Sequence, residues 1–516
     1  MERESKLIIA HHQEPAALIP SLNPVASTIY ISNLLFSYFT IYNDRMEAQP
    51  DILTEIPTVA NGDISKNYRQ YRFRLRDDVY FHDGKQLTVK DVVCTYRLIM
   101  NPAVNVVSRA GYDIIERIET PDSLTVIFHL KETLPDFELT VFNGDPILPA
   151  HYFPNPGAES IAFTDFFKQP IGSGPYRFEE WISGSHISFT RHAQYFRGRP
   201  GLDGLTIKFI PSAGTMLLQL QTGEIMGYSN AEVAHLSQLN TLPHIRVYQT
   251  PMLTYEHIDF NLDHPILKER AVRQAIAKFI NREELIEKIY RNVGAVAYSD
   301  VHPMSPYYNP AVEQTGRWDP EGARKLLSDN GWIDRDDDGI RDKNGQSLVL
   351  NISTTAGRTQ REEIEQVLQY QLRDLGIQIN IRNYHPSVFF GPYEQQGILQ
   401  SGKFDLALFA WSVPPSPLGK SIFYSEHHLP PNGQNVCRIR NARLTDLLEQ
   451  GNRSFLFDDR KRIYDEVSLI LAQEVPVIPV LWRTKIDPYI DSLQNFRPNP
   501  TNSGDSWNAW EWTLSQ

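Results

Sequence analysis

The stretch Leu348–Asn383, LVLNISTTAGRTQREEIEQVLQYQLRDLGIQINIRN, decides the fold. Apolar residues alternate at its start, Leu348–Ile352, and again at its end, Ile377–Ile381, and this alternation predicts two β-strands. Between them the apolar residues follow helical spacing, and Gly376 stands where a glycine C-cap belongs. The helical positions are Ile364, Val367, Leu368, Leu372 and Leu375. A strand, a helix and a strand in this order predict a βαβ unit with parallel strands and a right-handed crossover.

The segment after this unit, Phe404–Trp411, is an almost continuous apolar run, which is typical of a strand buried on both faces. Alternating segments earlier in the chain predict further strands, at Tyr71–Leu75, Leu124–Leu130 and Leu205–Phe209. These patterns together predict an α/β fold. Because ligands of such folds bind beyond the carboxyl ends of the strands, Trp411 at the end of the buried run is a candidate ligand contact.

A capping box predicts a helix after the first alternating segment. Thr88 and Asp91 have the required spacing, and Pro102 predicts where the helix stops. The apolar face of this helix is expected to include Val92, Tyr96 and Ile99.

The composition is that of a soluble globular protein with a large core. Of 516 residues, 41% are apolar and 22% are charged, and a chain of this length has room for about three domains. The net charge of −12 argues against nucleic-acid binding, which depends on a basic surface. The apolar stretch Ile29–Tyr42 is interrupted by polar residues and is shorter than the ~20 residues of a membrane span.

The beginning of the chain has no recognisable export signal. Charged residues, Glu2, Arg3, Glu4 and Lys6, stand where a secretory signal has its apolar segment. Two interpretations stay open: a cytoplasmic protein, or an exported protein whose sequence is given without its signal.

Motifs of the common enzyme and metal-binding classes are absent from the sequence. There is no HExxH, P-loop, G-x-S-x-G or G-x-G-x-x-G motif. The pairs His11–His12 and His427–His428 are adjacent residues, which point to opposite faces of a strand, so no shared metal ion is expected. The two cysteines, Cys94 and Cys437, are too few for a disulfide framework, and we expect no bridge between them. Cys94 is expected to be a small buried residue.

One acidic loop resembles the beginning of an EF-hand calcium site. Asp334, Asp336 and Asp338 stand at alternate positions and Gly339 follows them, as in such loops. The acid expected at loop position twelve is replaced by Gly345. We therefore favour a polar turn over a calcium site.

Several short motifs occur in one order along nearly the whole chain. They are Leu22–Pro24, Tyr71–Arg76, Phe81–Gly84, Leu87–Val93, Ile171–Tyr176, Tyr195–Pro200, Gly223–Ile225, Val272–Ile276 and Trp332 with Asp334–Gly339. On these residues the chain resembles the family 5 bacterial extracellular solute-binding proteins, the oligopeptide, dipeptide and nickel receptors of ABC importers.

The resemblance implies a two-lobed clamp of the periplasmic-binding-protein type II, with an extra subdomain inserted in lobe one. Lobe one is expected at 1–41, 165–252 and 482–516, the inserted subdomain at 42–164 and lobe two at 253–481. The hinge is expected near Met252–Tyr255 and Pro479–Trp482.

The resemblance also implies what the protein does. It is expected to act at the periplasmic or extracellular face of the membrane as the substrate-binding component of an ABC importer. It is expected to capture a small ligand, an oligopeptide, in a closing cleft and deliver it to a membrane permease. It implies a monomer with no catalytic residue, no cofactor and no nucleic-acid partner. A hydrolase is a competing hypothesis, which predicts His and carboxylate side chains clustered in the cleft.

The residues that the resemblance places at the ligand are Tyr30, Tyr255, Trp411, Ser412, Asn435 and Trp482. Three of them have other interpretations. Trp411 and Tyr30 are also compatible with ordinary core aromatics, and Asn435 is compatible with a turn residue.

One position departs from the family pattern. Many peptide-binding members have an aspartate three residues after this tryptophan, which pairs with the α-amine of the peptide, whereas this chain has Pro414. Glu256, Asp259 or Glu426 could replace that acid, or the cargo could lack a free amine. An oligosaccharide or another amine-free polar solute is therefore the alternative ligand.

Overall fold

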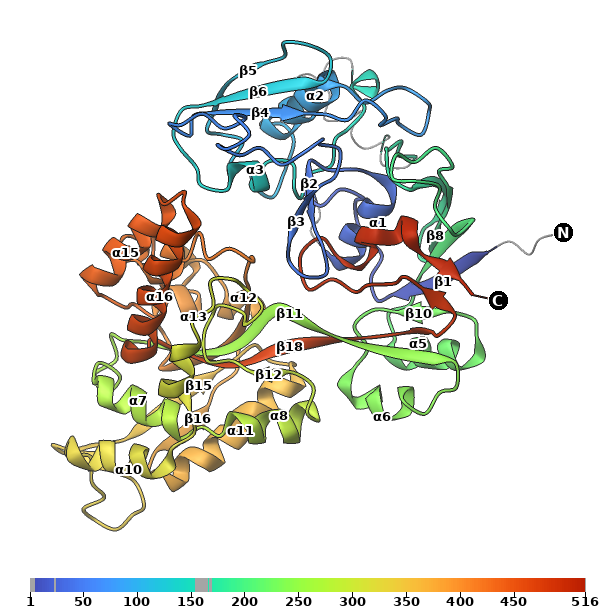
Figure 1. Ribbon diagram of the computed structural model, residues 1–516. Coiled ribbons are helices and arrows are strands. Elements are labelled where there is room, and N and C mark those ends of the chain that lie inside the picture. The colour runs from blue at the N-terminus through green and yellow to red at the C-terminus, as the bar shows by residue number, and fades with distance from the viewer. Residues whose placement is uncertain (1–4, 23–24, 154–165, 167–168, 516) are drawn as a thin grey trace. The chain divides into compact units, whose positions relative to one another are not determined.

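The computed structural model describes residues 5–22, 25–153, 166 and 169–515 (Figure 1). The chain divides into two compact units: unit 1 comprises Met1–Thr250 and Lys485–Gln516, and unit 2 comprises Pro251–Thr484. The chain enters unit 2 within strand β11 (Ile245–Phe260) and leaves it within β18 (Val477–Ile490). The boundaries of lobes, inserted subdomain and hinge given above stay predictions.

The strands of unit 2 form a mixed sheet in the order β16-β15-β17-β11-β18, with β12 (Ala295–Val296) paired to β18. Strand β15 (Val349–Ser353) pairs in parallel with β16 (Gln378–Ile381) and with β17 (Leu406–Ser412). Helix α11 (Thr359–Asp374) connects β15 to β16, so the predicted βαβ unit is confirmed. Gly376 follows the helix with φ of 83°, the left-handed conformation that a glycine cap supplies.

The core of unit 2 forms because the apolar face of α11 packs on this sheet. Leu350 and Ile352 of β15 and Leu368 and Leu372 of α11 are fully buried in one cluster. The other helices of unit 2 with nine or more residues are α7 (Arg270–Phe279), α8 (Arg282–Tyr290), α10 (Pro320–Asp329), α15 (Ala442–Asn452) and α16 (Phe457–Glu474). Its short helices are α9 (Glu313–Gly316), α12 (Pro386–Phe389), α13 (Ile398–Ser401) and α14 (Ser421–Tyr424), and its remaining strands are β13 (Asp342–Lys343) and β14 (Gln346–Ser347).

Unit 1 has its own sheet segment, in the order β18-β10-β1-β9-β8-β7. Strand β1 (Lys6–His11) pairs in parallel with β9 (Gly204–Phe209) and β10 (Gly227–Tyr228). Strand β8 (His186–Arg191) pairs antiparallel with β9 and with β7 (Tyr176–Ile182). The helices of this part include α1 (Ala26–Leu35), α5 (Ala213–Thr222) and α6 (Leu236–Leu239). Two short pairs complete it: β2 (Thr40–Tyr42) with β3 (Ala48–Pro50), and β19 (Leu493–Gln494) with β20 (Thr513–Leu514). The mixed sheets and helices confirm the predicted α/β class.

A separate three-stranded sheet lies in the middle of the unit 1 sequence. Its order is β4-β6-β5, formed by β4 (Gln70–Arg74), β6 (Thr125–Leu130) and β5 (Ile115–Glu119), and it has a hydrophobic cluster of its own. Helix α2 (Val89–Met100) begins at the predicted capping box, and the backbone N–H of Thr88 donates to Oδ2 of Asp91 at 2.8 Å. Helix α3 (Phe137–Thr140) follows.

Both cysteines are buried and free, as expected for Cys94. Of the helices in the described part of the chain, none has the length and apolarity needed to span a membrane.

Candidate functional site

A cavity of about 230 Å³ lies within unit 2, beside the carboxyl end of β17. We call it the unit 2 cavity. Tyr255 of β11 and Trp411 and Ser412 of β17 line it, together with the loop 413–420. The position of Trp411 agrees with the expectation that a ligand site lies beyond the end of the buried strand.

The proline-rich loop forms the wall of this cavity because it cannot continue the sheet. Val413 still donates its backbone N–H to the carbonyl of Leu253, at 2.8 Å. Pro414 and Pro415 have no N–H to donate, so the strand ladder ends and the chain turns away. The loop then lines the cavity down to Lys420.

Strand pairing places three of the predicted aromatic residues in one cluster. Tyr255 and Trp411 are opposite each other in the antiparallel pair β11–β17, and Trp482 of β18 pairs with Ala295 of β12. The ring centroids of Tyr255 and Trp482 are 4.9 Å apart, and Trp411 packs against this pair. Tyr255 and Trp482 are almost fully buried, whereas Trp411 is half-buried. Burial raises the pKa of Tyr255 well above its usual value, so its phenol is neutral.

A buried histidine–aspartate pair supports this cluster. Nδ1 of His257 lies 2.8 Å from Oδ1 of Asp259, and both residues are on the same face of β11 as Tyr255. The ring of His257 lies against Phe409, with centroids 4.3 Å apart. His257 therefore belongs to the packing beneath the cavity wall.

Two charged residues that the sequence did not single out lie in the cavity. Asp300 and Lys420 each have about 7% of their surface exposed, and Nζ of Lys420 is 2.5 Å from Oδ1 of Asp300. Burial lowers the pKa of Lys420, and the nearby Asp300 opposes that effect. His302 also lines the cavity, and burial lowers its pKa to about 4, so its ring is neutral at pH 7. No sequence motif marks these residues, because they belong to two loops that are far apart in the chain.

The other predicted site residues have different surroundings. Ser412 is exposed, and its Oγ is 2.8 Å from Oγ1 of Thr254. Asn435 is fully buried, and its Nδ2 donates to the carbonyls of Ser425 (3.0 Å) and Ile439 (3.1 Å). In this arrangement the amide of Asn435 holds a turn. Its role as a ligand contact stays a prediction.

Tyr30 lies in the core of unit 1. It is 3% exposed, and its ring is in edge contact with His11, with centroids 4.7 Å apart. The ring of Trp512 also packs against Tyr30, with 6.3 Å between the ring centroids. These surroundings are those of a core aromatic, and a contact of Tyr30 with ligand stays a prediction.

The acids considered as substitutes for the missing aspartate at Pro414 have other partners. Glu256 is fully buried and forms ion pairs with Arg361 and Arg483, with 3.0 Å between its Oε2 and Nε of Arg361. Burial would raise the pKa of Glu256, but the two guanidinium groups hold it below its usual value. Asp259 pairs with His257, and Glu426 is half-buried in the 3-10 helix Glu426–His428.

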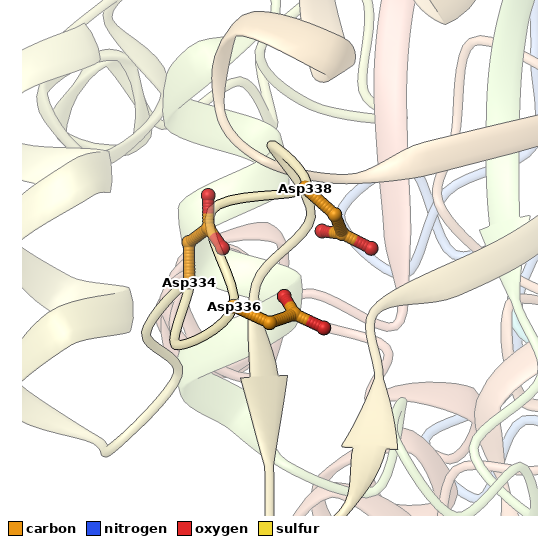
Figure 2. A group of neighbouring side chains, drawn as sticks. All are labelled: Asp334, Asp336 and Asp338. Atoms are coloured by element: carbon orange, nitrogen blue, oxygen red, sulfur yellow. The ribbon is translucent and has the colours of Figure 1, made fainter.

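The acidic loop after Trp332 brings three carboxylates together (Figure 2). One oxygen from each of Asp334, Asp336 and Asp338 lies within 4.8 Å of the others. Asp334 also accepts the backbone N–H groups of Asp337 (2.9 Å) and Gly339 (3.0 Å), as in a polar turn. Oxygen donors of this kind suit calcium, and calcium binding here stays a prediction.

The fold is that of substrate-binding proteins of ABC transporters. The structure is similar to that of the substrate-binding protein CtaP from Listeria monocytogenes, with a TM-score of 0.85, 24% identity, and coverage of 99% of this chain and 100% of that one. It is also similar to the oligopeptide-binding protein AppA from Bacillus subtilis, solved with a nonapeptide, with a TM-score of 0.74, 25% identity, and coverage of 99% and 100%.

Residues 47–426 match the family model described as "Bacterial extracellular solute-binding proteins, family 5 Middle". The chain belongs to this family. In sequence it is 26% identical to AppA of B. subtilis over 99% of this chain and 92% of that protein. It is 24% identical to di/tripeptide-binding protein 2 of Pseudomonas aeruginosa over 92% of this chain and 90% of that protein. The family consists of solute receptors and is not a catalytic family.

Proposed function

We propose that this chain is the extracytoplasmic receptor of an ABC importer, and that it captures oligopeptides and delivers them to a membrane permease. One observation carries the proposal. The unit 2 cavity brings Tyr255, Trp411 and Ser412 together in a chain that is similar, over 99% of its length, to a protein solved with a nonapeptide.

Capture requires a site that recognises peptides without reading each side chain. An extended peptide can satisfy main-chain groups of its receptor, and separate pockets then accept individual side chains. The face of Trp411 supplies an apolar wall for one such side chain. Receptors of this kind bind and release their cargo unchanged, and so they need no catalytic group.

Delivery requires two states that a permease can distinguish. The chain passes between its units only within β11 and β18, and we propose that these two crossings form a hinge. A ligand favours one state of a hinge protein by the difference in its affinity for the two states.

Native mass spectrometry of the purified protein tests the proposal, followed by analysis of what the protein releases on denaturation. Because a buried cargo often survives purification, we expect a heterogeneous set of short peptides. A single sugar-like or amine-free mass would contradict peptide capture and favour the alternative ligand. If the protein is empty, thermal shifts with a panel of peptides and sugars decide between the two.

A further inference from the structure

The ion pair between Asp300 and Lys420 belongs to the unit 2 cavity. Asp300 comes from the loop after β12, and Lys420 immediately precedes α14. Both line the cavity, and both are more than nine-tenths buried. Among the described residues that line the cavity, these two are the only carboxylate and the only ammonium group. The two charges cancel.

A neutral cavity disfavours charged ligand groups. An ammonium or carboxylate group that enters it loses its hydration, and no uncompensated charge of opposite sign is available there. His302 adds no charge at neutral pH, because burial holds its pKa at about 4. The carboxylate of Asp300 is not available to the ligand, because it already forms an ion pair with the ammonium group of Lys420.

The size and walls of the cavity suit a large apolar group. Trp411 and Phe423 contribute aromatic walls, with centroids 4.7 Å apart, and the proline-rich loop adds further apolar surface. In another protein an engineered apolar cavity of roughly 150 Å³ binds benzene. A volume of about 230 Å³ therefore has room for an aromatic side chain larger than a single benzene ring.

We propose that the unit 2 cavity accepts an uncharged aromatic or large aliphatic side chain of the cargo, and that Lys420 sets this preference by neutralising Asp300. This inference rests on the proposed capture of peptides. It predicts that the net charge of this pair determines which side chain binds, a relationship that we call the charge code. Lys420→Met leaves a buried carboxylate that favours a cationic group, and Asp300→Asn leaves a buried ammonium that favours an anionic group. The double variant is neutral again and should have the preference of the unaltered protein.

Alanine-based hexapeptides with a single Phe, Lys or Glu at each position test this code, with dissociation constants measured by calorimetry. For the unaltered protein we expect Phe at one position to bind at least about tenfold more tightly than Lys or Glu there, because a buried charged group without a partner costs at least this factor. At that position the Lys420→Met variant should bind the peptide with Lys most tightly, and the Asp300→Asn variant should bind the peptide with Glu most tightly. The double variant should again bind the peptide with Phe most tightly. The same order of preference in all four proteins overturns the inference.

Two controls separate the possible failures. Thermal unfolding checks that each variant folds; if one single variant does not fold, the other single variant and the double variant still decide the charge code. If no hexapeptide binds the unaltered protein, peptide capture fails. Toluene, benzylamine and phenylacetate then probe the cavity directly, and an unchanged order of these three across the variants overturns the charge code.

Discussion

The indole ring of Trp411 is parallel to the imidazole ring of His257, with 6° between the planes and 6.3 Å between the centroids. The hydrogen bond to Asp259 holds the ring of His257 in place. Because the indole of Trp411 stacks on this ring, the sheet supports one orientation of Trp411. A side chain fixed in this way loses little further conformational freedom when it contacts a ligand. Trp411 is therefore suited to be a rigid aromatic anchor.

Trp411→Ala should weaken the affinity for peptide by about 2 kcal/mol or more, since central aromatic anchors contribute this much. Calorimetry with the peptides that co-purify with the protein measures the effect. Trp318→Ala is the matched control, because Trp318 is 52% exposed and does not line the cavity. Equal affinities of the two variants, both folded, would remove Trp411 from the site.

Glu256→Gln should lower the free energy of unfolding by roughly 3 kcal/mol, because it leaves the mostly buried guanidinium group of Arg361 without its carboxylate partner. The pKa of Glu256 is held below its usual value of 4.5, so the stability that this carboxylate contributes is present above that pH. This contribution is lost as the pH falls through the lowered pKa. The difference in free energy of unfolding between the variant and the unaltered protein should therefore become smaller in that pH range. Urea unfolding at several pH values measures this.

The control for this prediction is an exposed ion pair. Glu321 is 86% exposed and pairs with Arg324 at 3.0 Å, so Glu321→Gln should change the stability by less than about 1 kcal/mol. Equal losses in Glu256→Gln and Glu321→Gln would show that the burial of Glu256 has no energetic consequence.

The sequence predicted those features that depend on local patterns. The alternation around Leu348 and Ile379 and the helical spacing between them were sufficient for the βαβ unit, because period and chain order determine such a unit. The capping box of Thr88 and Asp91 is local in the same way. The fold class follows from these elements.

The charged part of the cavity was not predictable from the sequence. Asp300 and Lys420 meet only because two loops far apart in the chain fold next to each other, and neither residue stands in a motif. The function of Asn435 was ambiguous for a related reason, since an amide in a loop suits a turn and a ligand equally well. Only the positions of the Ser425 and Ile439 carbonyls show which hydrogen bonds it makes.

Gly172→Ala should destabilise unit 1 by about 3 kcal/mol, at the upper end of the usual range for overpacking. A Cβ at Gly172 would lie 1.7 Å from the carbonyl oxygen of Leu35, the last residue of α1, so backbone must move. Gly144→Ala is the control, because its Cβ would have no described heavy atom within 4 Å. Thermal unfolding compares them, and similar midpoints would contradict the close approach at Gly172.

Glu365→Gln should make the protein more stable at high pH and leave it nearly unchanged at low pH. Burial raises the pKa of Glu365 in α11 from 4.5 to about 7, although Asn383 donates a hydrogen bond to it at 2.8 Å. Between these two pH values the folded protein binds more protons than the unfolded chain, so its stability falls as the pH rises. The whole effect is about 3 kcal/mol, because a pKa difference of one corresponds to about 1.4 kcal/mol, and it is complete above the folded pKa.

Urea unfolding at about pH 5 and about pH 8 measures this effect, since these values lie near the ends of the titration. The gain of Glu365→Gln over the unaltered protein should be much larger at the higher pH, because glutamine does not titrate. Glu363→Gln, an exposed position on the same helix, should leave the pH dependence of stability unchanged. If the gain of Glu365→Gln is the same at both pH values, the carboxylate of Glu365 does not titrate in this range, and its burial does not oppose folding at neutral pH.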